Sequence, residues 1–530
     1  MTTLASISIA FWHTLLRAQF VATIFIGLLL LRLLSNRFKR DLSSIPGPTL
    51  AKYTRLWRLY DAWTGETHSV SIRLHRKYGD VVRIGPKHVT FSHPNAIADI
   101  YGPTKAFSKT GFYSVQSSLL DNKVTENLFS TRDASFHRNQ KKVIANAYSM
   151  TSVLGMEDQI DSCITLLLSQ LKGKSRKKET VDLGQWVQFF AFDATGEVSF
   201  SKKLGFLREG RDFDGIINTI ASQLSYGNII GQIPELNHLL FGNRFFRMLF
   251  PQMENRNHIM QFTMKAVDTK LATSGTTTMS EQESADRGEP KGKDQDMLSR
   301  WWAIHEKDPD KLSRRDLILQ LSLNVMAGSD TQAISLRSTL NNMMHNPVKL
   351  IKARQEVDDA EAAGKLSGSI TYNEVTTHLP YVCACIKEGL RLHPAVGQPL
   401  ERHVPAGGAI ICGKYYPEGT VVGVNAWASQ RHPEFFQDPD EFIPERWLES
   451  SPAQLKDMER ALLYFGAGSR TCIGKNVALS GMHKLMAHLL REFDMKLHNP
   501  NKPLDIVCKG LVLQEGLLVD LEERKPSAKF

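Results

Sequence analysis

A short glycine-rich segment near the carboxyl terminus constrains this chain more than any other part of it. It reads Phe465-Gly466-Ala467-Gly468-Ser469-Arg470-Thr471-Cys472-Ile473-Gly474 and runs into a helix with apolar periodicity. A cysteine just before a helix amino terminus meets backbone N–H donors and the positive end of the helix dipole, which favours a thiolate. Gly468 and Gly474 let the backbone approach a flat ligand and donate to the sulfur. The segment therefore predicts that Cys472 ligates a metal held in a planar macrocycle.

Two further residues of this segment suit the same kind of site. Phe465 can shield the sulfur from water, and Arg470 can pair with a carboxylate of the macrocycle. Because a lone cysteine is more often an inert buried thiol than a ligand, the pattern around Cys472 carries the prediction. The other cysteines are few and irregularly spaced: Cys163, Cys383, Cys385, Cys412 and Cys508. They form no disulfide framework and fit a reducing compartment, and we interpret the Cys383/Cys385 pair as two small buried side chains rather than a zinc site.

The composition allows one large, basic domain. Of the 530 residues, 42% are hydrophobic and 23% are charged, which is the balance of a globular protein with a sizeable core. The formal net charge of +10 favours an acidic partner or an anionic membrane surface. We set nucleic acid aside as a partner, because the lysines and arginines are scattered and no recognition module is visible.

The amino terminus predicts a membrane anchor over residues 1–36. Leu4–Leu34 is strongly apolar, and it contains the about 20 apolar residues that a spanning helix needs when Ala18 or Arg32 is included. No small-residue cleavage site follows cleanly, which favours a retained anchor over a removed signal peptide. The basic residues at the end of the span are Arg32, Arg37, Lys39 and Arg40. They place the rest of the chain on the cytoplasmic side.

Two segments make up the rest of the chain. Residues 37–48 are a basic stem with a proline hinge, Ile45-Pro46-Gly47-Pro48, which ends any helix and holds the next domain at a set angle. Residues 49–530 are predicted to be one catalytic domain. Within it, the polar segment Thr273–Gln295 is interpreted as an exposed loop between helices.

The hydrophobic pattern of this domain is mostly helical. Its periodicity predicts a long helix over Leu312–Met344 and two more within Tyr372–Leu392. Short strands are expected near Val81–Ile84, Val89–Phe91 and Val421–Val424. The predicted fold class is therefore mainly α with a small, segregated β part.

The pattern Phe465-x-x-Gly468-x-Arg470-x-Cys472-x-Gly474 resembles the haem-binding signature of the cytochrome P-450 superfamily. Three further motifs match this family in the expected order, so the resemblance covers nearly the whole chain. It implies a triangular, mainly helical fold with a haem b between the long helix and the Cys472 loop. Cys472 would then be the axial ligand of the iron.

The first further motif is Glu388-x-x-Arg391. At a spacing of i, i+3 the two side chains share a helix face and can pair, which alone is typical of a surface ion pair. Downstream, Phe442–Trp447 resembles the family segment whose arginine, here Arg446, completes a buried network. The resemblance implies that Glu388, Arg391 and Arg446 are structural and not catalytic.

The second motif is Ala327-Gly328-Ser329-Asp330-Thr331, midway along the predicted long helix. Asp and Thr compete for backbone hydrogen bonds and tend to distort a helix, so alone the motif is typical of a solvent-facing turn. It resembles the oxygen-binding groove of the family. The resemblance implies that Thr331 hydrogen-bonds to oxygen in the site and that Asp330 relays protons from solvent.

The third group concerns the haem carboxylates. Arg402 stands where the family places a propionate-binding arginine, and His137-x-x-x-Lys141 stands where many members have Trp-x-x-x-Arg. His137 and Lys141 depart from the commoner pattern but can still donate to a carboxylate; a solvated basic helix face is the alternative. The family lines its substrate pocket near residues 112–113, 327, 395–399 and 512–515. The residues found there predict an apolar pocket.

The implied reaction inserts one atom of O₂ into a lipophilic organic substrate. The resemblance implies NADPH electrons delivered by a separate cytochrome P-450 reductase, cytochrome b5 as a second donor, and a single-pass protein of the endoplasmic reticulum. IPGP, LAKYTRLWRLYDAW and FSKTGFYSVQ resemble the fungal pisatin-demethylase-like group, which implies secondary metabolism or detoxification. Two alternatives stay open: a haem-thiolate isomerase or dehydratase that needs no reductase, and a non-catalytic haem sensor. The Asp330-Thr331 pair argues against the first.

Overall fold

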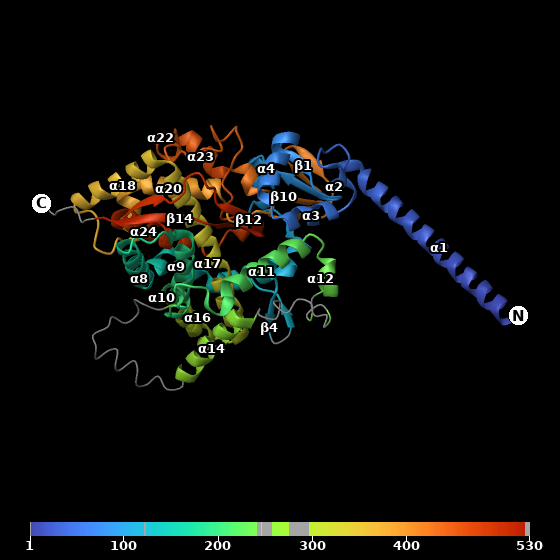
Figure 1. The fold of residues 1–530 in the computed structure, drawn as a ribbon, viewed down its shortest axis with the longest axis horizontal. Helices are drawn as coiled ribbons and strands as arrows, with labels where there is room; N and C mark the ends of the chain where they lie inside the picture. Colours follow the sequence, from blue (N-terminus) through green and yellow to red (C-terminus); the bar gives the residue numbers. More distant parts are fainter. Residues whose placement is uncertain are drawn as a thin grey trace.

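The structure is a computed structural model that describes residues 2–120, 123–240, 245, 248, 257–274 and 296–524. Helices dominate it and the strands form small separate sheets, which confirms the predicted fold class (Figure 1). The longer helices are α1 Thr2–Arg37, α3 Leu56–Thr64, α4 Thr67–Tyr78, α6 Ala134–Ile144, α8 Glu157–Arg176, α9 Leu183–Phe200, α11 Ile216–Ile230, α14 Asn257–Ser274, α16 Met297–Lys307, α17 Arg314–His345, α18 Pro347–Ala362, α20 Pro380–Leu392, α23 Pro452–Arg460 and α24 Lys475–Glu492. Short helices include α2 Thr49–Tyr53, α5 Asn95–Tyr101, α12 Glu235–Leu240, α19 Tyr372–His378 and α22 Arg446–Glu449. Of the predicted loop Thr273–Gln295, residues 275–295 lie outside the described residues.

The long central helix α17 confirms the helix predicted over Leu312–Met344. It begins with a capping box, in which the Ser313 hydroxyl accepts from the N–H of Asp316 and the Asp316 carboxylate accepts from the N–H of Ser313. This cap moves the start of the helix to Arg314. Because its residues are apolar or small on most sides, α17 is buried along much of its length and packs against α9 and α20. It passes through the middle of the molecule (Figure 1).

The main sheet has five strands in the order β1-β2-β10-β7-β3. Their bounds are β1 Val81–Arg83, β2 His88–Phe91, β10 Val421–Val424, β7 Arg402–His403 and β3 Ser108–Lys109. β1, β2 and β10 are the three predicted strands, and β1 ends at Arg83 because Gly85 and Pro86 turn the chain into β2. The pairing of β3 with β7 places Lys109 directly opposite Arg402. The smaller sheets contain β4 Ser118–Leu120, β5 Lys123–Thr125, β6 Val181–Asp182, β8 Ala409–Ile411, β9 Lys414–Tyr416, β11 Phe493–Leu497, β12 Asp505–Lys509, β13 Leu511–Glu515 and β14 Leu518–Glu523.

The amino-terminal helix α1 extends away from the rest of the molecule (Figure 1). Its segment Leu15–Arg37 is long and apolar enough to cross a membrane and is not buried against the protein. This agrees with a membrane anchor at the amino terminus, and the helix itself ends at Arg37. The proline hinge lies against β1, since the N–H of Arg83 donates to the carbonyl of Pro46 at 2.7 Å and a side chain at Gly47 would overlap the Arg83 carbonyl oxygen.

The largest hydrophobic core joins α8, α9, α17, α20 and α24. A second core lies beneath the five-stranded sheet. Of the two cysteines in α20, Cys385 is fully buried, as predicted, and Cys383 is half-buried. The fold therefore packs α17, α20 and α24 against one another in one core. α17 carries Asp330 and Thr331, α20 carries Glu388 and Arg391, and the Cys472 loop leads into α24.

Candidate active site

Cys472 lies in a tight loop that leads into α24. Its backbone N–H donates to the carbonyl of Phe465 at 2.8 Å, which closes the loop. Gly468 has a φ of 65°, a left-handed conformation that favours glycine, and a Cβ there would overlap the carbonyl oxygen of Tyr101. The fold itself thus requires Gly468. A Cβ at Gly474, in contrast, would meet no atom within 4 Å, so space is open beside the cysteine.

The thiol of Cys472 is accessible although dense protein surrounds it. Its side chain is exposed to solvent on one side. The protein packed around the rest of it desolvates the thiol and raises its pKa. The backbone N–H groups of Gly474 and Lys475 and the ammonium of Lys141 act in the opposite direction and stabilise a thiolate. α24 begins at Lys475, which confirms that Cys472 precedes a helix amino terminus.

Lys141 and His137 lie one turn apart on α6 and take different positions. The ammonium of Lys141 donates to the carbonyls of Ser469 at 3.0 Å and Thr471 at 3.1 Å, so it supports the loop that carries Cys472. His137 is buried, and burial together with the positive charge of Arg470 lowers its pKa to about 3. His137 is therefore neutral at neutral pH and can donate a hydrogen bond without adding charge.

Three cations lie close to this loop: Lys109 and Arg402 are buried, and Arg470 is half-buried. Lys109 and Arg402 face each other across β3 and β7, each with 6% of its surface exposed, and like charges so placed repel. Arg402 donates to the hydroxyl of Tyr113 at 3.0 Å, while Lys109 donates to the carbonyl of Phe129. Burial lowers the pKa of Lys109 well below its usual value, and the positive charges of Arg402 and Arg470 lower this pKa further. Burial and Arg402 likewise lower the pKa of Arg470 to about 10.

Lys109, His137, Arg402 and Arg470 together form what we call the carboxylate-binding cluster. Two carboxylates placed among these side chains would cancel the repulsion between them and supply charge-assisted acceptors. The donor set therefore fits the two propionates of a haem whose iron faces Cys472. Lys109 was not predicted from the sequence; the signal for it is the register of β3 on β7, which joins segments far apart in the chain.

The middle of α17 is open to solvent although the helix is buried on either side. Ala327 is exposed, and Gly328 and Thr331 are half-buried. The Thr331 hydroxyl donates to the carbonyl of Ala327 at 2.7 Å, a bond to the preceding turn that lets the helix run unbroken through the motif. The helix is therefore not interrupted at the Asp330-Thr331 pair. The Thr331 hydroxyl lies at the accessible stretch.

Asp330 points away from Thr331 and into the contact between α17 and α9. It is 2% exposed and accepts from the side-chain amide of Gln188 at 2.6 Å. Arg337 in turn donates to the other end of that amide at 2.7 Å. Burial raises the pKa of Asp330 to about 6, although the hydrogen bond from Gln188 acts to lower this pKa. Gln188 was not predicted, because α9 is buried on nearly all sides and shows no polar pattern that would single it out.

An apolar wall stands near the accessible stretch of α17. Ile334 packs with Ala395 and Leu513, and all three are buried. The N–H of Val512 donates to the carbonyl of Ala395 at 2.8 Å and joins the two loops. The structure thus packs residues from α17, the 395–399 segment and the 512–515 segment together. The apolar substrate pocket stays a prediction.

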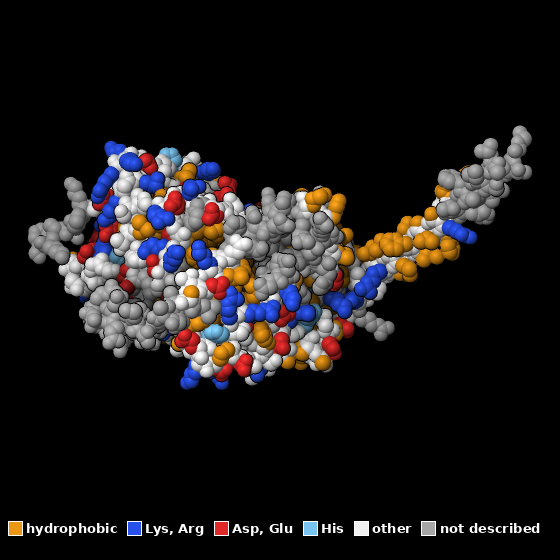
Figure 2. Space-filling view, turned by 90° about the horizontal axis from the view of Figure 1, so that it is seen from below, with side chains coloured by type: hydrophobic (Ala, Val, Ile, Leu, Met, Phe, Trp, Pro, Cys, Tyr) orange, Lys and Arg blue, Asp and Glu red, His pale blue; other side chains and the backbone are white. Residues whose placement is uncertain are grey.

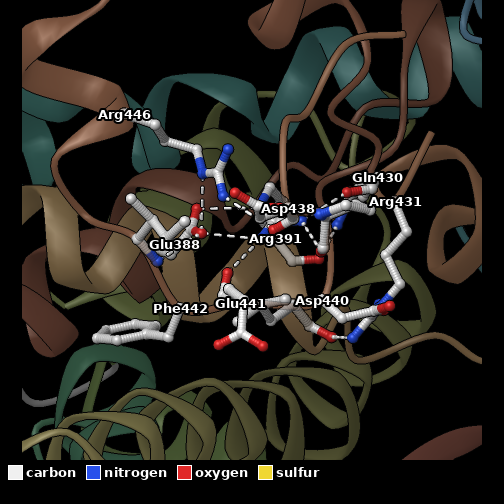
Figure 3. A network of polar contacts seen from close by, with 12 residues as sticks. Glu388, Arg391, Gln430, Arg431, Asp438, Asp440, Glu441, Phe442 and Arg446 are labelled. Atoms are coloured by element: carbon white, nitrogen blue, oxygen red, sulfur yellow. Dashed lines mark hydrogen bonds and ion pairs between the residues drawn. The ribbon is translucent and has the colours of Figure 1, made fainter. Parts of the chain in front are cut away.

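Glu388, Arg391 and Arg446 form one buried network (Figure 3). Arg391 donates to both carboxylate oxygens of Glu388 at 2.9 and 2.8 Å, and Arg446 donates to Glu388 at 3.1 Å. The indole of Trp447 and the backbone N–H of Ile443 complete the carboxylate shell at 2.9 and 3.1 Å. These donors satisfy both oxygens of the buried carboxylate.

Gln430 connects this network to the segment that leads to Cys472. Its side-chain amide donates to the carbonyl of Arg391 at 2.7 Å and accepts from the N–H of Leu463 at 2.8 Å. Arg391 also donates to the backbone carbonyl of Gln430 at 2.8 Å. The buried ion pair therefore supports the base of the Cys472 loop.

An accessible thiol at a helix amino terminus, a cluster of buried and half-buried cations and a long central helix suit the class of haem-thiolate proteins. Comparison with known proteins agrees. Residues 46–519 match the model of the family described as Cytochrome P450. A cytochrome P450 monooxygenase of Aspergillus terreus is 37% identical over 456 residues, which cover 86% of this chain and 90% of the relative. The chain belongs to the cytochrome P450 family.

Other fungal relatives cover different shares of their own length. The cytochrome P450 monooxygenase cicH of Emericella nidulans is 33% identical over 509 residues, which span 96% of this chain and 99% of the relative. The cytochrome P450 monooxygenase mpaDE of Penicillium roqueforti is 36% identical over 463 residues, but these make up 53% of that longer protein and 87% of this chain. The protein is therefore an oxidoreductase of the monooxygenase type. Its family implies a haem with a cysteine thiolate ligand, a redox partner and a lipophilic substrate.

Proposed function

We propose that this protein inserts one atom of O₂ into a lipophilic organic substrate of fungal secondary metabolism or detoxification, by hydroxylation, demethylation or epoxidation. The observation that carries the proposal is the accessible Cys472 thiol in a loop beside the carboxylate-binding cluster. A haem held there, with Cys472 as its iron ligand, supplies the activation of oxygen. Phe465 shields the sulfur, and the open space at Gly474 allows close approach of the ring.

The other site residues bind the haem carboxylates, hold the Cys472 loop, carry protons or maintain the fold. Lys109, His137, Arg402 and Arg470 bind the haem carboxylates, and Lys141 keeps the Cys472 loop in place. Thr331 places its hydroxyl at the accessible stretch of α17, where it donates to the Ala327 carbonyl. Asp330, with its pKa near 6, takes up and releases a proton close to neutral pH, and Gln188 holds its carboxylate. Glu388, Arg391 and Arg446 maintain the fold around the site.

The anchor and the charge of the protein define its surroundings. α1 is the membrane anchor, residues 37–48 are the stem and hinge, and residues 49–530 are the catalytic domain. The basic stem favours a cytosolic domain on the endoplasmic reticulum. There NADPH-cytochrome P450 reductase supplies the electrons and cytochrome b5 serves as a second donor, each through an acidic surface that complements the basic protein.

Turnover with and without reductase tests this function. Purified full-length protein in lipid vesicles is expected to consume NADPH and O₂ and to form an oxygenated product only when the reductase is present. Products labelled from ¹⁸O₂ identify the source of the inserted atom. Turnover of an oxygenated substrate without NADPH would establish the isomerase or dehydratase instead, and haem binding without any turnover of metabolite extracts would establish the sensor.

Replacing Thr331 by alanine is expected to divert electrons to peroxide. Without the hydroxyl, proton delivery in the site slows, and product per NADPH should fall roughly ten- to a hundred-fold while NADPH oxidation continues. Peroxide and product measured in the same reaction give the ratio. Ser335→Ala is the matched control, since Ser335 makes the same bond to the preceding turn of α17, to the Thr331 carbonyl at 2.9 Å. Unchanged coupling in Thr331→Ala would remove Thr331 from the proton path.

A further inference from the structure

Arg83 of β1 holds the membrane helix on the catalytic domain. Its side chain is fully buried and donates to the carbonyl oxygens of Asn36 at 2.5 Å, Arg37 at 3.3 Å and Leu42 at 3.1 Å. The remaining donors reach carbonyls of residues 85–86, in the turn that follows β1. The last carbonyls of a helix lack partners within the helix and carry partial negative charge, so a buried cation suits them. The end of α1 is thereby fixed to the main sheet.

This attachment sets which part of the domain lies at the membrane surface. The candidate membrane span of α1 ends at Arg37, after the polar residues Ser35 and Asn36. We therefore infer that the boundary between hydrocarbon and headgroups lies in the last turn of α1. α2 packs against the same end of α1, and the side-chain amide of Asn36 donates to the carbonyl of Tyr53 at 2.8 Å. α2 and the turn between β1 and β2 therefore lie at the level of the headgroups.

Five cations gather at this level, three from α1 and the stem and two from the catalytic domain. We call them the cationic collar: Arg32, Arg37, Lys39, Lys52 and Lys87. Burial lowers the pKa of Lys39, and the charges of Lys87, Arg32 and Arg83 lower it further. Burial lowers the pKa of Lys52, followed by the charges of Arg37 and Arg83. Among the described residues, every charge that shifts the pKa of these two lysines is positive, so repulsion between cations dominates around them.

The surface next to the collar is suited to lipid rather than to an acidic protein. Figure 2 shows a run of lysine and arginine side chains that leads across the domain to the base of α1. Beside it, Leu50 of α2 and Tyr60 and Trp63 of α3 are exposed by 56%, 61% and 67%. Tyrosine and tryptophan favour the boundary between headgroups and hydrocarbon, because each ring has an apolar body and a polar edge.

We propose that the cationic collar is a binding site for the headgroups of anionic phospholipids, to which the folded domain contributes Lys52 and Lys87. The proposal rests on the cytosolic orientation proposed above. Phosphate and carboxylate groups of a lipid such as phosphatidylserine neutralise the collar and hold α2 and the β1–β2 turn against the bilayer. Because Arg83 joins this region to the sheet, the bound lipids also fix the height and tilt of the catalytic domain.

Spin-labelled lipids test the proposal with the full-length, haem-loaded protein. The protein is placed in phosphatidylcholine vesicles that contain traces of labelled phosphatidylserine or labelled phosphatidylcholine. The immobilised fraction seen by electron paramagnetic resonance is expected to show a preference for phosphatidylserine. The double variant Lys52→Gln/Lys87→Gln should reduce this preference at least about five-fold. Lys177→Gln/Lys307→Gln, which removes the same charge from the carboxyl-terminal cap of α8 and the last residue of α16, should leave it unchanged.

Each contrary result has its own meaning. An unchanged preference in Lys52→Gln/Lys87→Gln would overturn the proposal, because the stem cations alone would then attract the lipid. Displacement of the label by excess inorganic phosphate would assign the collar to free phosphate instead. A variant that keeps its lipid preference but loses affinity for the reductase would make the collar a protein-docking surface. Protease access to the domain in sealed microsomes checks the orientation separately, and product formation plays no part in the readout.

Discussion

Cys472→Ala is expected to abolish the red-shifted Soret band of the reduced carbon monoxide complex and all oxygenase activity. The other groups around the sulfur, such as Lys141 and the N–H groups of Gly474 and Lys475, stabilise a thiolate and cannot replace it. Cys472→His should shift the spectrum to that of an imidazole ligand if haem is retained. Difference spectra of the purified variants provide the measurement.

Cys412→Ala is the control for this experiment. Cys412 is also an exposed free thiol, but it lies in the turn between β8 and β9, away from the site. Its loss should leave the spectrum unchanged. If the Cys472→Ala protein kept the thiolate band, Cys472 would not be the ligand of the iron.

Arg391→Gln is expected to cost about 3–5 kcal/mol of folding stability, because it leaves the buried carboxylate of Glu388 with only part of its compensation. A domain of this kind has about 5–15 kcal/mol in total, so the substitution removes a large fraction of its stability. The expected result is a large loss of haem-loaded protein and a strongly lowered Tm in what is recovered.

The surface pair Asp457 and Arg460 offers a matched control. It has the same i, i+3 spacing, a distance of 3.1 Å and 54% exposure of each side chain, against 2.8 Å and no exposure for Glu388 and Arg391. Arg460→Gln should cost less than about 1 kcal/mol. Equal effects of the two substitutions would show that burial does not decide the role of Arg391.

The fold could be predicted where a local pattern determines it. α17, α19 and α20 follow from apolar periodicity, and β1, β2 and β10 follow from short apolar runs with glycine and proline at their ends. The exact start of α17 depends on the capping box at Ser313, which moves it past Leu312. The partners of each strand are not local, so the order of the main sheet could not be obtained in this way.

In the site, too, the residues in local motifs could be predicted and those that act through long-range contacts could not. Cys472 and its glycines form a continuous motif, and Glu388 and Arg391 share one helix face, so both were within reach of sequence reasoning. Lys109 and Gln188 act through long-range contacts, with Arg402 across β3 and β7 and with Asp330 across α9 and α17. Neither contact leaves a trace in composition or spacing. Lys141 was expected beside a carboxylate, and its two bonds to the Cys472 loop became visible only in three dimensions.

The attachment at Arg83 also bears on how a soluble form of this enzyme should be made. Truncation at the proline hinge would remove Asn36, Arg37 and Leu42, whose carbonyls accept three of the hydrogen bonds from a fully buried guanidinium. Buried donors without partners destabilise a fold. A truncation point inside α1, before Asn36, removes most of the apolar segment and keeps those carbonyls in place. The structural boundary between the anchor and the catalytic domain therefore lies within the last turns of α1, before the proline hinge.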